Sequence, residues 1–188
     1  MPAASPGGIR EALQAALVDQ GDRLYALALK TTRDPDLAAD ALQEAFATAL
    51  RQADQFRGEA SLGTWLHRIV FNKSIDLLRR QKRDAARASP DPGAESWDEV
   101  REGHAPAWAH PPDELLLGAE TRDALERALA ELTPLQRAVI ELRQVEGRST
   151  AETAEILEQS EGAVRVQLHR ARLRLRALLA PHLHGERR

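Results

Sequence analysis

The sequence predicts an all-α protein built as two small helical domains joined by a flexible linker, and three observations carry this prediction. Alanine, leucine, arginine and glutamate dominate the composition, and these residues are strong helix formers. Runs of β-branched residues, which favour strands, are absent. A proline-rich stretch from Ala88 to Pro112 interrupts the helical periodicity. A length of 188 residues accommodates two small domains.

The interrupting stretch is interpreted as a linker because it combines five prolines and two glycines with an irregular pattern of apolar residues. Its Trp97 and Trp108 indicate either a docking surface or side chains that fold back onto one of the domains. The expected organisation is a first domain over residues 9–87, a linker over residues 88–112 and a second domain over residues 113–180.

Three helices are expected before the linker. The first spans residues 9–32. The second spans residues 35–53, because Asp34 can cap it and Pro35 suits its first turn. The third spans residues 62–87 and carries apolar side chains on two opposite sides. A helix that is apolar on two sides is expected at the centre of a bundle.

Four helices are expected after the linker. The first covers residues 113–131. Thr133-Pro134-Leu135-Gln136 and Ser149-Thr150-Ala151-Glu152 both match the capping box, so two further helices begin at Pro134 and Thr150. Each such cap typically contributes about 1 kcal/mol.

The last part of the chain has the pattern of a helix-turn-helix. A short helix over residues 150–157 precedes the turn Glu158-Gln159-Ser160 and a longer basic helix over residues 161–180. The turn contains no glycine, so Glu158 or Gln159 is expected to adopt an unfavourable backbone angle.

The formal net charge of −3 hides a separation of charge along the chain. Residues 61–88 carry a net charge of +5 and residues 162–188 a net charge of +6, whereas residues 89–120 carry −7. Two basic segments on an otherwise acidic chain favour two contacts with one polyanion. Charge alone is equally consistent with two solvated helix faces.

Several classes of protein are excluded or disfavoured by composition. The chain has no cysteine, which excludes a disulfide scaffold and a thiolate nucleophile. Its six histidines are scattered, and it has no glycine-rich phosphate loop, so we expect no metal, no cofactor and no catalytic residue. The N-terminus lacks the pattern of a signal peptide, and no apolar run is long enough to span a bilayer. A cytoplasmic protein without membrane insertion is expected.

The last helix combines a buried face with a basic one. Its apolar residues recur at helical spacing, and a group of cationic side chains lies beside them. Guanidinium groups bind guanine edges and phosphates, and the first half of such a helix can enter a major groove. A merely solvated basic helix is the alternative. The apolar face comprises Val164, Leu168, Ala171, Leu175 and Leu178. The arc beside it comprises Arg165, His169, Arg172 and Arg176, with Val166 and Arg170 further round the helix.

The helix over residues 62–87 carries a different constellation. Cationic groups and one amide share a narrow arc near the turn Phe56-Arg57-Gly58. This combination suits single-stranded or opened DNA, because cations hold the backbone, an amide reads a base edge and an aromatic ring stacks. Trp65 is expected in the core, and Phe56 is expected to meet a base. The residues of the arc are Arg68, Asn72, Arg79 and Arg83.

From about Leu13 to Leu179 the chain resembles the extracytoplasmic-function (ECF) group of bacterial RNA polymerase sigma factors in the sigma-70 family. The segments that resemble region 2 of that group are Asp40-Ala41-Leu42-Gln43-Glu44-Ala45-Phe46, Phe56-Arg57-Gly58, Thr64-Trp65-Leu66, Arg68-Ile69, Asn72 and Ile75-Asp76-Leu77-Leu78-Arg79-Arg80. The segments that resemble region 4 are Leu132-Thr133-Pro134-Leu135-Gln136-Arg137, Gly162-Ala163-Val164-Arg165 and Leu168-His169-Arg170-Ala171-Arg172. The ordered set is highly specific to this group.

The resemblance implies a subunit that binds RNA polymerase core, directs it to promoters and has an anti-sigma factor as a partner. It implies contact with the clamp helices of the largest catalytic subunit, with the flap of the second-largest subunit and with both promoter elements. The implied clamp contacts are Asp40, Gln43 and Glu44. The implied minus-ten contacts are Phe56, Ser61, Arg68, Asn72, Arg79 and Arg83. The implied minus-thirty-five contacts are Arg165, Val166, His169, Arg170 and Arg172.

Four residues depart from the commoner choices of the group, namely His67, Phe71, Val166 and Gln167. These departures affect which promoter sequence is preferred and do not change the implied role as a sigma factor. Two other functions stay open at this point. One is a helix-turn-helix regulator whose first domain only dimerises or senses a signal, and the other is an adaptor that touches polymerase without touching DNA.

Overall fold

The computed structural model describes residues 6–88 and 119–183, and every regular element within these ranges is a helix. The predicted all-α class is confirmed for these residues. The segment from Ser89 to Gly118, which holds most of the predicted linker and both of its tryptophans, lies outside the described residues. The first part comprises α1 (Pro6–Thr32), α2 (Pro35–Arg51), the 3₁₀ turn η1 (Ala53–Gln55) and α3 (Leu62–Ala88). The second comprises α4 (Ala119–Ala130), α5 (Pro134–Ile140), the π-helical turn η2 (Glu141–Val145), α6 (Thr150–Leu157) and α7 (Glu161–Leu183).

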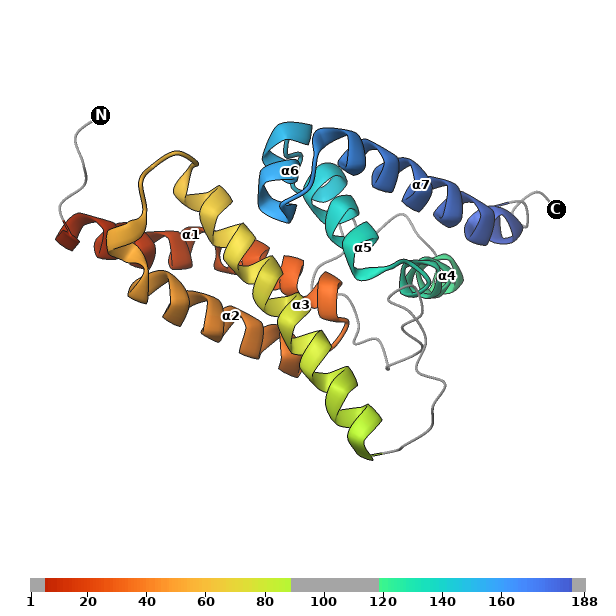
Figure 1. Cartoon of the computed structure of the whole chain (residues 1–188). Coiled ribbons are helices and arrows are strands. Elements are labelled where there is room, and N and C mark those ends of the chain that lie inside the picture. Colours follow the sequence, from red (N-terminus) through yellow and green to blue (C-terminus); the bar gives the residue numbers. More distant parts are fainter. Residues whose placement is uncertain (1–5, 89–118, 184–188) are drawn as a thin grey trace.

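Helices α1, α2 and α3 form one bundle (Figure 1). The Asp34 side chain accepts hydrogen bonds from the backbone N–H groups of Asp36 and Leu37, at 2.9 and 3.0 Å, which confirms the predicted cap of α2. Helix α2 presents alanines to its neighbours, and small side chains let helices approach closely. The fully buried alanines of α2 are Ala38, Ala41, Ala45 and Ala49.

The prediction that α3 is apolar on two sides is confirmed. On one side Leu66 and Val70 belong to the core of the first bundle. On the other side Phe71 belongs to a second core, which it shares with Leu27 of α1 and with side chains of α5, η2, α6 and α7. The second bundle therefore packs directly on α1 and α3.

Both predicted capping boxes are present in the second bundle. Thr133 pairs with Gln136 at the start of α5, and Ser149 pairs with Glu152 at the start of α6. Glu158, which follows α6, has a φ of 52°, so it adopts the left-handed conformation that was expected for this turn. The π-helical turn η2 was not predicted.

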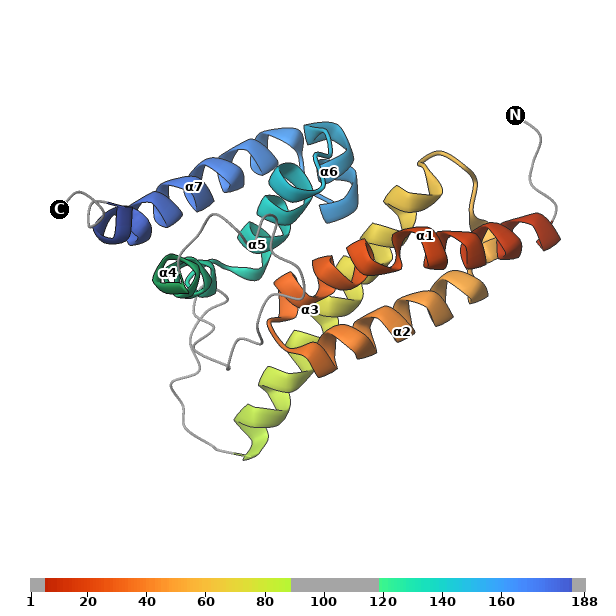
Figure 2. The same cartoon turned by 180° about the vertical axis from the view of Figure 1, so that it is seen from behind.

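The apolar face of α7 is shorter than predicted. Val164 and Ala171 are buried, and Leu168 packs against the second core, but Leu178 is 37% exposed. Helix α7 packs against α4, α5 and α6. Both views show α7 on the side of the second bundle that faces away from α1–α3, whereas α6 lies against the first half of α3 (Figures 1 and 2).

A buried arginine ties α5 to the end of α1. The Arg137 guanidinium donates hydrogen bonds to the carbonyl oxygens of Lys30 at 2.7 Å, of Thr31 at 3.1 Å and of Leu132. The last carbonyls of a helix have no partner within it, so Arg137 satisfies groups that would otherwise need water. Burial lowers the pKa of Arg137 to about 9, and the guanidinium remains charged at neutral pH.

Glu141 of η2 is buried beside Lys30, and burial raises the pKa of its carboxyl to about 7. Because this pKa exceeds that of the unfolded chain, the folded state favours the protonated carboxyl. The associated stability is fully present below the unfolded pKa near 4.5 and is lost as the pH rises through about 7.

The variant Glu141→Gln replaces this carboxyl by a neutral group of similar shape. We expect the variant and the wild type to be similarly stable at pH 5, and the variant to be more stable by about 1 to 3 kcal/mol at pH 8. Urea unfolding at the two pH values measures the difference, with the exposed Asp123→Asn as the control. Parallel pH profiles for the wild type and Glu141→Gln would contradict this assignment.

Candidate nucleic-acid interface

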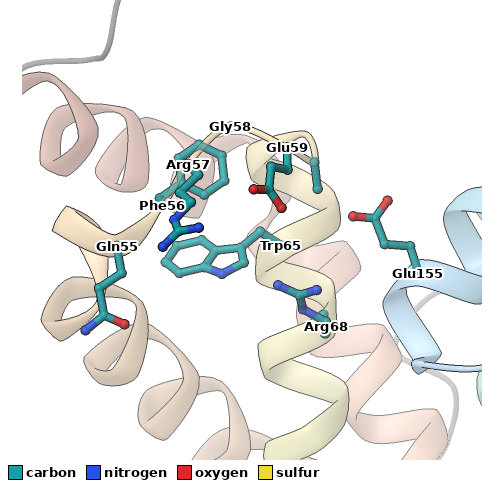
Figure 3. A pocket seen from close by; sticks show the side chains of 9 residues that line it. Gln55, Phe56, Arg57, Gly58, Glu59, Trp65, Arg68 and Glu155 are labelled. Carbon is teal, nitrogen blue, oxygen red and sulfur yellow. The ribbon is translucent and has the colours of Figure 1, made fainter.

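A pocket opens between the loop that follows η1 and the first turns of α3 (Figure 3). Its volume is about 130 Å³. The loop can turn sharply because Gly58 has a φ of +71°, a conformation that other residues rarely adopt. The pocket is lined by Gln55, Phe56, Arg57, Gly58, Glu59, Ala60, Trp65, Arg68 and, from α6, Glu155.

Two aromatic rings form the apolar wall of this pocket. The Phe56 and Trp65 ring centroids are 5.1 Å apart, with the ring planes tilted by 47°. Trp65 is 8% exposed, which confirms its predicted place in the core. Phe56 is half-buried and packs on the same core, so the ring that lines the pocket is held in place by Trp65.

The polar wall comes from α3. Arg68 lines the pocket, and Asn72 lies one helical turn further along the helix. The Asn72 side-chain N–H donates to a Glu158 carboxylate oxygen at 3.4 Å, so this amide already has a partner in the second bundle. Arg79 and Arg83 are exposed on later turns of α3, and Arg79 lies 3.7 Å from Asp76.

Ser61 caps the start of α3 beside the pocket. Its hydroxyl oxygen accepts a hydrogen bond from the backbone N–H of Thr64 at 3.0 Å and contacts the Thr64 hydroxyl at 2.9 Å. These contacts satisfy the first turn of α3, as an N-cap does. The loop and the helix are thereby fixed relative to each other.

The predicted basic face of α7 is accessible. Arg165 pairs with Glu161 at 2.6 Å and Arg172 donates to Gln144 at 2.8 Å, and both side chains remain exposed. Val166 is 48% exposed beside them. A solvent-exposed apolar side chain that lies between cationic ones is suited to contact a thymine methyl group in a major groove. The remaining exposed side chains of this face are His169 and Arg170.

The implied clamp contacts on α2 differ in their exposure to solvent. Asp40 and Gln43 are exposed to solvent. Glu44 is half-buried, and its carboxylate lies 3.3 Å from Lys73 and 3.3 Å from Arg80, both on α3. In the structure, Glu44 therefore helps to hold α2 against α3.

A buried polar network joins the two bundles beside the pocket, and the sequence reasoning missed it. The His67 ring of α3 is fully buried, and its Nε2 lies 3.1 Å from a carboxylate oxygen of Glu146. Arg148 binds the same oxygen at 2.8 Å and contacts the His67 ring. Burial raises the pKa of Glu146, but hydrogen bonds and charge from His67 and Arg148 outweigh burial and hold it below its usual value. In the sequence, the one sign of this network was that His67 differs from the residues that are commoner at its position in the group.

Two further findings bound the chemistry of the described residues. The described part of the chain contains no group of three or more acidic, histidine or cysteine side chains that could hold a metal ion. Among the helices at residues 6–88 and 119–183, none is both long and apolar enough to cross a membrane.

Comparison with known proteins shows which protein family the two bundles match. A family model of sigma-70 region 2 matches residues 17–84, and a model of sigma-70 region 4 matches residues 122–175. The ECF RNA polymerase sigma factor SigM of Mycobacterium tuberculosis is 38% identical over 157 residues, which cover 84% of this chain and 71% of SigM. The chain belongs to the ECF group of the sigma-70 family. It is a promoter-specificity subunit of bacterial RNA polymerase that binds the core enzyme and promoter DNA.

Other relatives agree with this assignment. The ECF RNA polymerase sigma-E factor of Escherichia coli is 35% identical over 133 residues, which cover 71% of this sigma factor and 69% of the relative. Two solved structures share the fold at 24% sequence identity. The sigma factor RpoE of Bartonella quintana, in complex with the anti-sigma factor NepR, has a TM-score of 0.66 and covers 90% of this chain and 98% of its own. CnrH, in complex with the cytosolic domain of CnrY, has a TM-score of 0.61 and covers 94% and 92%.

Proposed function

We propose that this sigma factor contacts its promoter through two separate surfaces and contacts core polymerase through a third. Residues 9–87 form the region 2 domain, residues 88–112 the linker and residues 113–180 the region 4 domain. The observation that carries this proposal is the pairing of an aromatic and cationic pocket on α3 with an exposed basic face on α7. The two surfaces belong to different bundles, as two separated promoter elements require.

The pocket beside α3 takes an unstacked base of the non-template strand at the minus-ten element. Phe56 and Trp65 supply an apolar wall, and Arg68 and Asn72 supply polar groups at its edge. Holding an unstacked base costs a few kcal/mol, and one good aromatic contact returns about 1 to 3 kcal/mol. Arg79 and Arg83 continue the cationic surface along α3 and contact the backbone of the strand. Ser61 fixes the loop that closes the pocket.

The exposed face of α7 lies in the major groove of the minus-thirty-five element. Arg165, Val166, His169 and Arg170 face the bases, and Arg172 faces the backbone. The outward position of α7 supports this proposal, because α4, α5 and α6 contact it on one side and the side chains of its basic face are exposed.

The exposed face of α2 binds the clamp helices of the largest catalytic subunit through Asp40, Gln43 and Glu44, and region 4 binds the flap of the second-largest subunit. Core polymerase supplies the chemistry, so this sigma factor contributes no catalytic step and needs no cofactor. It acts in the cytoplasm. An anti-sigma factor is a further partner, as for RpoE of Bartonella quintana, whose structure is solved with NepR.

Reconstitution with purified core polymerase tests the proposed function as a whole. Sequencing the transcripts that this holoenzyme makes from genomic DNA should reveal start sites that share two upstream elements. Core polymerase without the sigma factor is the control. Transcription that does not depend on the sigma factor, or start sites without shared elements, would contradict the proposal. Binding of a symmetric dimer to duplex DNA without core would favour a conventional helix-turn-helix regulator instead.

The variant Arg165→Ala tests the minus-thirty-five contact. We expect it to weaken promoter binding by the holoenzyme by about 1 to 3 kcal/mol and to relax specificity at one base pair, because a base-reading guanidinium is lost. Competition between promoter fragments that differ at single base pairs measures both effects. The matched control is Arg127→Ala, which removes an exposed arginine from α4. Equal losses on every fragment would reduce Arg165 to a phosphate contact.

The variant Asn72→Ala tests the minus-ten contact. We expect a loss of about tenfold or more in open-complex formation, because removing one base-reading group typically costs 1 to 3 kcal/mol, with little change in core affinity. Permanganate footprinting of the melted region measures opening directly. Asp84→Ala, an exposed residue near the end of α3, serves as the control. Normal opening by Asn72→Ala holoenzyme would remove Asn72 from the site.

The variant Asp40→Lys tests the clamp contact. Reversing an exposed charge in an interface should weaken core binding by about tenfold and lower the association rate, while the protein stays folded. Titration of labelled sigma factor with core polymerase gives both quantities. Asp54→Lys makes the same reversal on η1, away from the proposed α2 face. An unchanged affinity for Asp40→Lys would show that core docks elsewhere.

A further inference from the structure

We propose that Val166 makes promoter binding by this sigma factor depend on the 5-methyl group of one pyrimidine in the minus-thirty-five element, in thymine or in 5-methylcytosine. This inference rests on the proposed position of α7 in the major groove. It goes further because it names the chemical group that one side chain of α7 recognises, and with it a feature of the promoter sequence.

Val166 is an exposed apolar side chain among cationic ones. It is 48% exposed, and residues 162–188 carry a net charge of +6. A cationic surface attracts a polyanion such as DNA. The apolar group that DNA presents in its major groove is the 5-methyl group of thymine, and cytosine methylated at C5 carries the same group at the same place. Contact with this methyl group would remove apolar surface of Val166 from water.

Gly162 leaves one flank of Val166 open. Side chains of a helix lean toward its N-terminus, so the Val166 side chain lies over the turn that begins near Gly162, four residues earlier. Among the side chains of the described residues, a Cβ atom at Gly162 would meet only the Ser160 hydroxyl oxygen within 4 Å, at 3.8 Å. This part of the helix surface is therefore open, and it belongs to the half of a recognition helix that enters a major groove.

The two chain neighbours of Val166 are engaged elsewhere. The Arg165 guanidinium lies 2.6 Å from the Glu161 carboxylate, one turn earlier in α7. The Gln167 side chain is half-buried, and its Oε1 lies 3.5 Å from the side-chain nitrogen of Gln136 on α5. One neighbour is thus directed along α7 and the other toward α5, and the isopropyl group between them stays accessible to a base edge.

Arg170 gives the methyl contact a sequence context. It follows Val166 by four residues on the same face of α7, is exposed, and forms no hydrogen bond or ion pair within the described residues. Such a guanidinium can bind O6 and N7 of a guanine. Four residues of a helix rise about 6 Å, and stacked bases lie about 3.4 Å apart. The methylated pyrimidine is therefore expected within about two base pairs of a guanine.

Promoter fragments with single changes test the methyl contact in the holoenzyme. Each thymine of the minus-thirty-five element is replaced in turn by deoxyuridine, which lacks only the 5-methyl group, and binding is measured by competition. At one thymine we expect binding to weaken about fourfold, the factor for burying one methyl-sized group. Val166→Ser should bind both fragments equally, whereas Val166→Ile should keep the preference. The matched control is Val18→Ser, which removes a 90% exposed valine from α1 and should also keep it.

Methylated cytosine distinguishes the two sources of the methyl group. The same thymine is replaced by cytosine, and fragments with and without methylation at C5 are compared. A gain of about fourfold on methylation, absent in Val166→Ser, would show that either base supplies the group, whereas a deoxyuridine effect without this gain assigns it to thymine. The proposal is overturned if no methyl group affects binding, or if Val166→Ser responds to methyl groups as the wild type does.

The Arg165→Ala variant separates this inference from the proposed function. If Arg165→Ala relaxes promoter specificity while no methyl group affects binding, α7 still reads the element and only the methyl contact is wrong. If neither Arg165→Ala nor Val166→Ser changes promoter binding, the proposed position of α7 in the major groove is wrong as well.

Discussion

Helix α3 buries apolar side chains on two sides, and the rest of the structure depends on how those two sides are covered. One side completes the region 2 bundle through Leu66 and Val70. The other side, with Phe71, would face water if region 2 stood alone, and α6 covers it in this structure. Exposing such a surface is unfavourable, so the two domains have a physical reason to associate. The same helix carries Arg68 and Asn72, and covering its apolar side also covers these polar groups.

The polar contacts between the domains give this association a specific geometry. Arg137 donates hydrogen bonds to the last carbonyl oxygens of α1, and the network of His67, Glu146 and Arg148 joins α3 to the connection before α6. Buried charges are weak sources of stability, because desolvation offsets most of their attraction. Their directional bonds nevertheless select one arrangement among the many in which two apolar faces can meet. The apolar contact thus supplies most of the stability of this association, while Arg137 and the network of His67, Glu146 and Arg148 set how the two domains align.

Much of the fold was predictable because it is encoded locally. Helix starts follow from short signals such as Asp34 with Pro35 and the two capping boxes, and each acts within four residues. The two apolar sides of α3 and the left-handed residue after α6 were also readable from periodicity and from the missing glycine. The exposed tail of α7 at Leu178 was not, because periodicity predicts which residues share a face and cannot show where the covering helices end.

The sites were predictable to a smaller degree. The positions of Arg68 and Asn72 on one arc of α3 follow from spacing alone, but the pairing of Asn72 with Glu158 joins residues 86 positions apart. The sequence predicted two domains joined by a linker. It gave no sign of the contacts between them, because such contacts produce no periodic pattern of residues. His67 and Phe71 were visible only as departures from the commoner residues of the ECF group. Both lie at the contact with region 4, which gives these departures a structural reason.

The most direct test of this account is a reversible bridge across the pocket. Ala60 of the loop and Glu155 of α6 line the same pocket, and in this chain without cysteine they can be replaced by Cys and joined with a short, reducible bis-methanethiosulfonate reagent. The measured quantity is promoter-dependent transcription with core polymerase before and after reduction. The account predicts efficient bridging of the free protein, loss of transcription in the bridged form and recovery once the bridge is reduced. Full transcription by the bridged form would contradict it, because α6 would then not need to leave the pocket.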